Sequence, residues 1–127
     1  MGAWSTDSFG NDKALDWFGD LTVSEDVFGF IRRTLEAGPS EGVVAAGEIL
    51  AFLRGRPDPT IPSDVEEWCR GKQMPSPELL ELADKVIQQM LDDPKADVHD
   101  CWAELGEDDE DYQAWLSSLR GIQMRLR

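Results

Sequence analysis

Apolar side chains recur every three or four residues through most of this chain, which is the spacing of an α-helix that buries one face. The clearest case follows Ser76-Pro77, a capping side chain with proline at the first helical position. The pattern predicts an amphipathic helix that ends at Asp93-Pro94, because proline cannot continue a helix. Its apolar positions are Leu79, Leu82, Ala83, Val86, Ile87 and Met90.

The N-terminal part of the chain carries three further helical segments. Asn11-Asp12 and Ser24 are positioned to cap the first two segments, and Ser40 to cap the third. The third segment, residues 41–55, contains Ala45-Ala46-Gly47, whose small side chains let neighbouring helices approach closely. We therefore expect residues 41–55 to form the central buried helix.

Polar residues also mark the start of three later segments. Ser63-Asp64-Val65-Glu66 has the spacing of a capping box and predicts a short helix that ends at Gly71. Asp97 can cap residues 98–105. The acids of residues 107–111 then precede a last helix, where they complement the positive end of its dipole. The apolar stripe of that helix is Tyr112, Trp115, Leu116, Leu119, Ile122 and Leu126.

These segments together predict an all-α fold. No stretch alternates β-branched with polar residues, as a half-buried strand would, and no internal repeat is present. We expect residues 1–127 to form one compact domain of about six or seven helices, with the N-terminal segment tied down against the core.

The opening residues carry an unusual density of large and capping side chains. We interpret them as a structural lock, in which Trp4 and Phe9 plug the helical core. A ligand-binding or partner-binding loop is the alternative, because glycine-rich loops can turn backbone groups outward. Residues 1–6 also fit a loose myristoylation pattern, without the basic patch that would supply a second anchor. The predicted lock comprises Trp4, Phe9, Asn11, Asp12, Asp16 and Trp17.

Charge is the strongest global feature of the sequence. Asp and Glu number 26 against 12 Lys and Arg, for a net charge of −14. Such a polyanion is repelled by nucleic acid and by anionic membrane, and no apolar run approaches the ~18 residues of a membrane span. With no secretory leader, the sequence predicts a cytoplasmic protein that binds neither, and its charge favours a basic protein partner.

Candidate chemistry centres on the single histidine and the two cysteines. His99, Cys101 and Cys69 could contribute to a metal or catalytic site. On a helix, however, positions 99 and 101 point about 200° apart, and the paired ligand spacing of structural zinc sites is absent. No nucleophile elbow or phosphate-binding loop is present. We predict no cofactor, no metal and no catalytic residue, and expect both cysteines to be free thiols.

Ten acids fall between residues 92 and 111, where Lys95 is the only Lys or Arg. Acidic patches accelerate encounter with cationic partners, and neighbouring aromatic side chains supply anchoring contacts. We therefore expect a non-enzymatic protein-binding module, of the immunity or antitoxin-like kind. The alternatives are an enzyme or metal protein, and a housekeeping domain with no ligand site. The predicted partner-binding residues are Asp97, Asp100, Trp102, Glu104, Glu107, Asp108, Asp109, Glu110, Asp111 and Tyr112.

The opening motif resembles the start of the bacterial family known as "domain of unknown function 4259". The matching residues are Met1-Gly2, Trp4, Phe9, Asn11-Asp12, Ala14 and Asp16-Trp17. The tail is similar as well, with Trp102 to Leu105, an acidic linker, Trp115, and a Leu-Arg ending. Ser5 departs from the pattern, which has glycine there. The resemblance implies a bacterial cytoplasmic protein and supplies no agreed activity, so it transfers no catalytic residue.

Overall fold

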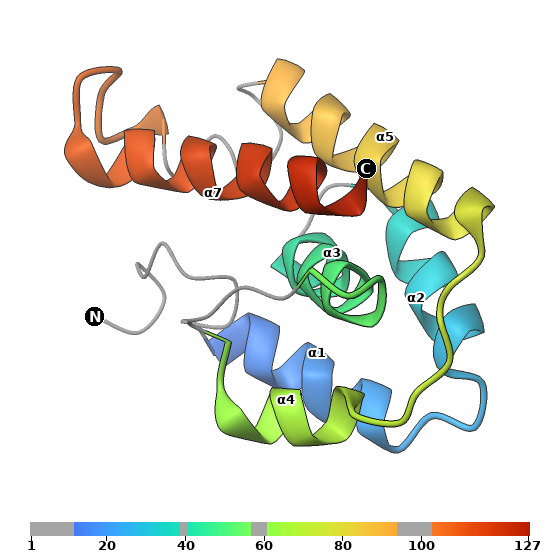
Figure 1. Ribbon diagram of the computed structural model, residues 1–127. Helices are drawn as coiled ribbons and strands as arrows, with labels where there is room; N and C mark the ends of the chain where they lie inside the picture. The colour runs from blue at the N-terminus through green and yellow to red at the C-terminus, as the bar shows by residue number, and fades with distance from the viewer. Residues whose placement is uncertain (1–11, 39–40, 57–60, 94–102) are drawn as a thin grey trace.

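Helices occupy most of the predicted segments in the computed structural model, which describes residues 12–38, 41–56, 61–93 and 103–127. Within those ranges the chain forms six α-helices and no strand, which confirms the all-α prediction (Figure 1). The helices are α1 (Asp12–Thr22), α2 (Val27–Glu36), α3 (Glu41–Leu53), α4 (Ser63–Cys69), α5 (Pro77–Asp92) and α7 (Glu110–Leu126). Among the described residues no helix is long and apolar enough to cross a membrane.

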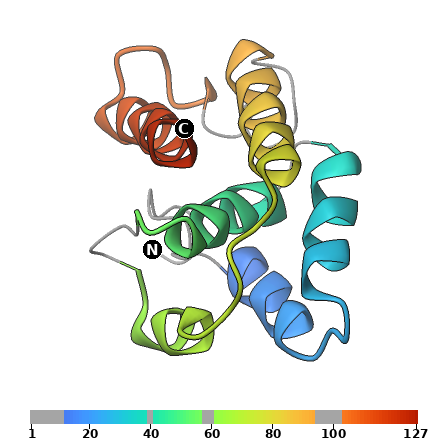
Figure 2. The same cartoon turned by 45° about the vertical axis from the view of Figure 1, so that its right-hand side comes forward.

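Helix α3 lies at the centre of the molecule, as its composition predicts. It contacts each of the other five helices described, with α1 and α4 on one side and α5 and α7 on the other (Figures 1 and 2). Every residue from Val43 to Ala51 is buried. A helix that is apolar on nearly all sides is stable only in such a position.

Gly47 lies where α3 packs against both α5 and α7. A Cβ atom at this position would lie 2.9 Å from Cγ2 of Ile122 and 2.9 Å from Cδ1 of Ile87. Both distances are shorter than side-chain packing permits, so only glycine fits without movement of a neighbour. The expected close approach at Ala45-Ala46-Gly47 is therefore confirmed.

The apolar stripes of α5 and α7 are buried as predicted. All the predicted apolar positions of α5 are buried except Leu82, which is half-buried. All six of the predicted stripe in α7 are buried, and Gln123 is buried with them. Ser76 caps α5 as expected, because its Oγ accepts a hydrogen bond from the Leu79 amide at 3.3 Å.

Two of the predicted caps are wrong. Helix α2 is capped by Asp26, whose Oδ1 accepts from the Gly29 amide at 3.0 Å; Ser24 instead donates to the Asp26 carbonyl. At α4 the N-cap is Pro62, with φ −59° and ψ 145°. Ser63 therefore lies inside the first turn, and no side chain caps this helix. The expected caps of α1 and α3, Asn11 and Ser40, lie outside the described residues.

Candidate functional site

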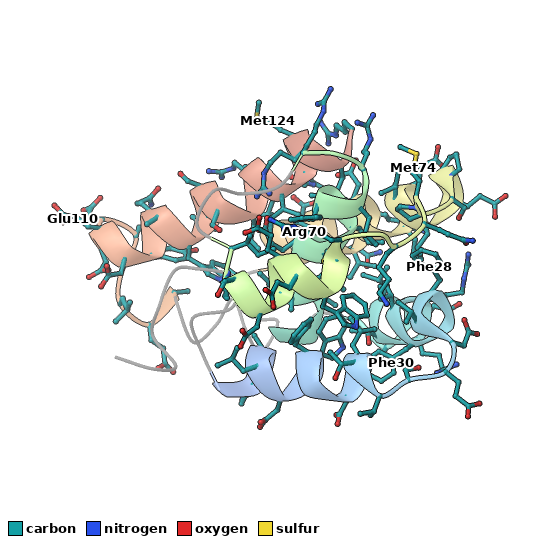
Figure 3. The ribbon with its side chains drawn as sticks, turned by 60° about the horizontal axis from the view of Figure 1, so that its bottom comes forward. Phe28, Phe30, Arg70, Met74, Glu110 and Met124 are labelled. Carbon is teal, nitrogen blue, oxygen red and sulfur yellow. The ribbon has the colours of Figure 1, made fainter. Side chains whose placement is uncertain are left out.

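The two ends of α7 carry opposite charge and form the candidate site. Its first turn holds Glu110 and Asp111, and the residues just before it are also acidic. Its last turns hold Arg120 and Arg125, and Arg127 follows as its C-cap. Figure 3 shows Glu110 at one end of this helix and Met124 toward the other. The two ends differ in whether their charged side chains form ion pairs with other helices.

The acidic end is built around a tight loop and a helix cap. Gly106 has φ +102°, a conformation that favours glycine, and its carbonyl accepts from the Asp109 amide at 3.1 Å. Asp109 then caps α7, because its Oδ1 accepts from the amides of Asp111 at 2.9 Å and Tyr112 at 3.2 Å. This carboxylate is half-buried and committed to the cap.

The other acids of the loop face solvent. We call these exposed side chains the acidic surface: Glu104, Glu107, Asp108, Glu110 and Asp111. Within the described ranges none of them forms an ion pair with a lysine or arginine. Leu105 lies in the same loop with 45 % of its surface exposed. The acidic surface thus combines unmatched negative charge with one apolar contact point.

Not all the predicted partner-binding residues contribute to this surface. Tyr112 is only 7 % exposed and Trp115 only 3 %, so both aromatic rings belong to the core. Their position in the apolar stripe of α7 places them inward, and neither is available as an anchor for a partner. Asp97, Asp100 and Trp102 lie outside the described residues.

The basic end of α7 is bound to α3 and α5 by ion pairs. Arg127 Nε lies 3.0 Å from Asp84 Oδ2, and its Nη2 lies 3.3 Å from Oδ1. This hydrogen bonding and the charge of Asp84 raise the pKa of the Arg127 guanidinium. Gln123 also donates to Asp84 Oδ1, at 2.9 Å. These contacts hold the last turns of α7 against α5.

Glu48 is a buried charged residue that the sequence pattern did not single out. It lies on the central helix with 2 % of its surface exposed, and its carboxylate pairs with Arg125. Arg125 Nη2 lies 3.2 Å from Glu48 Oε2, and Nη1 also contacts Oε1. The sequence did hold one sign of this ion pair: Glu48 is the single acid inside the otherwise apolar segment 43–53. Because a buried carboxylate requires a partner, an acid in that position predicts a basic side chain beside it.

The described part of the predicted lock shows how α1 is held. Trp17 Nε1 donates to Thr34 Oγ1 on α2 at 2.8 Å, and the indole packs against Phe30 with ring centroids 5.7 Å apart. A Cβ at Gly42 of α3 would lie 2.8 Å from the Trp17 ring. Asp12 begins α1 and Asp16 is exposed, whereas Trp4, Phe9 and Asn11 lie outside the described residues. Trp17 therefore joins α1 to α2 and α3.

The candidate metal and thiol chemistry rests on one described residue. Cys69 is a free, buried thiol, and burial raises its pKa to about 12. A thiol with that pKa is protonated at neutral pH and is a poor nucleophile. His99 and Cys101 lie outside the described residues. The described ranges contain no group of three or more His, Cys, Asp or Glu side chains that could hold a metal ion.

Comparison with known proteins gives one match. Residues 2–118 match the family model described as "Domain of unknown function (DUF4259)". No curated protein and no solved structure matches the chain.

Proposed function

Because the chain belongs to the DUF4259 family, whose description names no activity, we propose its function from its surface. We infer that it is a non-enzymatic binding module for a basic protein, which it contacts through the acidic surface. Small acidic proteins that neutralise a basic toxin, such as immunity proteins or antitoxins, are the functional class that fits this chemistry.

The observation that supports the proposal is unmatched charge beside an exposed apolar side chain. Glu107 and Asp108 lie in the loop between Gly106 and the cap of α7, where neither carboxylate serves the fold through a described contact. Surface acids that stabilise nothing locally raise the association rate with a cationic partner. Leu105 adds apolar area: because 45 % of its surface is exposed, a partner that covered it would gain about half of the ~1.5–3 kcal/mol of a fully exposed leucine.

A charge-reversal experiment tests this proposal. The double variant Glu107→Lys with Asp108→Lys is used as bait in the lysate of the source organism, next to wild type. Its matched control reverses two exposed acids elsewhere, Glu25→Lys with Glu36→Lys, so that net charge is the same. We expect wild type and control to capture the same basic protein at about 50 mM salt and less of it at about 300 mM. The loop variant should capture none.

The variant Leu105→Ser distinguishes specific binding at the acidic surface from general attraction between opposite charges. This variant keeps every charge, so simple electrostatic adhesion would be unchanged. The proposal requires weaker capture with the same salt dependence. Equal loss of the partner in loop variant and control would show that net charge alone governs capture, and would refute the site.

A further inference from the structure

The outward face of α7 is an exposed surface of its own, apart from the loop that precedes the helix. Helices α3 and α5 pack along the inward side of α7, which lies at an edge of the molecule (Figure 2). The outward side carries five exposed side chains spaced alternately three and four residues apart, which is the spacing at which one helix packs lengthwise against another. We call these side chains the outer face: Glu110, Gln113, Ser117, Arg120 and Met124.

The two charged members of the outer face are not used by the fold through ion pairs. Glu110 and Arg120 are both exposed, and within the described ranges neither forms an ion pair. Arg120 differs in this from the two arginines that follow it, which pair with acids of α3 and α5. Between these charges, Gln113 donates to the Glu107 carbonyl at 2.6 Å, and its side-chain oxygen can accept a further hydrogen bond.

The order of these side chains is complementary to itself when two helices run antiparallel. Glu110 and Arg120 are ten residues apart, which is about 15 Å along the helix, and Gln113 and Ser117 lie between them at equal distances from the midpoint. A second copy placed antiparallel about that midpoint brings its Arg120 opposite Glu110 and its Ser117 opposite Gln113. The two-fold symmetry forms each contact twice. A parallel copy would instead oppose like charges at both positions.

We propose that the outer face of α7 binds a second copy of this chain, as an antiparallel pair of helices related by a two-fold axis. Opposite charges then face each other at both ends of the contact, and this complementarity selects the occupant. The flanking positions Ala114 and Gly121 carry no bulky side chain that would hold the helices apart. Glu107, Asp108 and Leu105 are not part of the outer face, so the pairing does not rest on the function proposed above.

Three features make this dimer weak. Each copy has a net charge of −14, although at about 150 mM salt the Debye length of ~8 Å screens distant charges more than a pair in contact. Asp92 lines a groove between α5 and α7 together with Arg120, and competes for it with Glu110 of the second copy. A helix of 17 residues is about 25 Å long and ~10 Å wide, so one face covers less than the ~800 Å² of a standard interface. We expect a dissociation constant on the order of 0.1 mM.

Sedimentation equilibrium of the full chain, from about 20 µM to about 1 mM at about 150 mM salt, measures the pairing. Wild type should pass from monomer to dimer over this range. Arg120→Glu opposes like charges at both ends of the contact and should weaken the dimer about tenfold or more. Arg32→Glu, on the exposed face of α2, makes the same charge change and should pair like wild type. Arg120→Gln gives a milder loss variant if Arg120→Glu melts early.

A mixture of two charge variants gives the most specific result. The outer face carries two acids in Arg120→Glu and two arginines in Glu110→Arg, so neither variant should pair with itself. Mixed in equal amounts, the two chains place every acid opposite an arginine and should form a mixed dimer with about the wild-type affinity. Both chains remain strongly acidic, so general attraction between opposite net charges cannot produce this dimer.

Four results would overturn the proposal. These are a wild type that stays monomeric at about 1 mM, equal weakening by Arg120→Glu and Arg32→Glu, or a mixture of the two folded variants that stays monomeric. In the fourth, dimers that survive in both Arg120→Glu and Glu110→Arg alone would place the contact on another face of the molecule.

Discussion

At the scale of single residues, the ion pair between Glu48 and Arg125 is more deeply buried than the other ion pairs found between described residues. Glu48 is 2 % exposed on the central helix, and Arg125 reaches it from the last turns of α7. A carboxylate in such a place is tolerated only when it is paired and hydrogen-bonded. The pair therefore fixes how the end of α7 sits on α3.

Arg125→Met should destabilise the fold by about 3–5 kcal/mol, because it leaves the buried Glu48 carboxylate without its guanidinium partner. Adding Glu48→Met should restore much of the loss, since no buried charge then remains. Urea unfolding of both variants measures the difference. If Arg125→Met alone lowers the free energy of unfolding no more than the double variant does, the ion pair contributes little to stability.

Cys69 should behave as an inert thiol. In a Cys101→Ser variant, where it is the only cysteine, it should react with a thiol reagent far more slowly in the native state than in urea. Its folded pKa of about 12 lies above the reference value of 9.0, so the folded chain holds the proton more tightly. The contribution of this thiol to stability is therefore constant below pH 9 and falls as pH rises from there toward about 12. Rapid native labelling at neutral pH would contradict this.

Whether a residue is buried or exposed was predictable from the sequence where its position in the helical repeat alone decides it. Tyr112 was an ambiguous case, because it belongs both to the acidic run and to the apolar stripe of α7, and burial resolved it in favour of the stripe. The pairing of Glu48 with Arg125 was not predictable, since 77 positions separate the two residues. Only the packing of α7 on α3 brings them together.

At the scale of helices, glycine positions decide how tightly the central helix can be packed. Gly47 faces Ile87 and Ile122 with no room for a methyl group, whereas a Cβ at Gly121 or Gly19 would meet nothing within 4 Å. All three glycines lie inside helices, so substitution by alanine changes helix propensity alike at each. Any difference between the three variants therefore reports the packing around the new methyl group.

Gly47→Ala should destabilise the fold by up to about 2 kcal/mol, because overpacking costs ~1–3 kcal/mol and the gain in helix propensity recovers ~1 kcal/mol. Gly121→Ala and Gly19→Ala should each stabilise by about 0.5–1 kcal/mol, since only propensity changes. Thermal unfolding of the three variants checks the signs. A stabilising Gly47→Ala would mean that α3 can move away from α5 and α7 at no cost.

Helix existence was predictable from the sequence, but some starting points were not. The stripes of α5 and α7 repeat over three or more turns, so the buried face is specified many times over. A cap depends on one residue. Ser24 and Asp26 are both capping types, and the path of the chain between α1 and α2 selects Asp26. Likewise, Pro62 takes the cap of α4 and leaves Ser63 in the first turn.

At the scale of the whole molecule, charge is separated along α7. The acidic surface at its start is unmatched, whereas Arg125 and Arg127 at its end pair with carboxylates of α3 and α5. The sequence predicted the acidic cluster but not this contrast, because pairing depends on which helices meet in space. The exposed acids of the loop thus repel one another without a described partner, which suits a binding surface better than a stabilising one.

The melting temperature of a neutralised loop tests this central claim most directly. In the triple variant Glu104→Gln, Glu107→Gln, Asp108→Asn, three charges of the acidic surface are removed while the cap Asp109 and the first turn of α7 are kept. If these acids serve binding rather than folding, the variant melts above wild type at about 20 mM salt, and the difference shrinks at about 500 mM, where repulsion is screened. A variant that melts below wild type at low salt would show that these carboxylates stabilise the fold, and the binding account would fail.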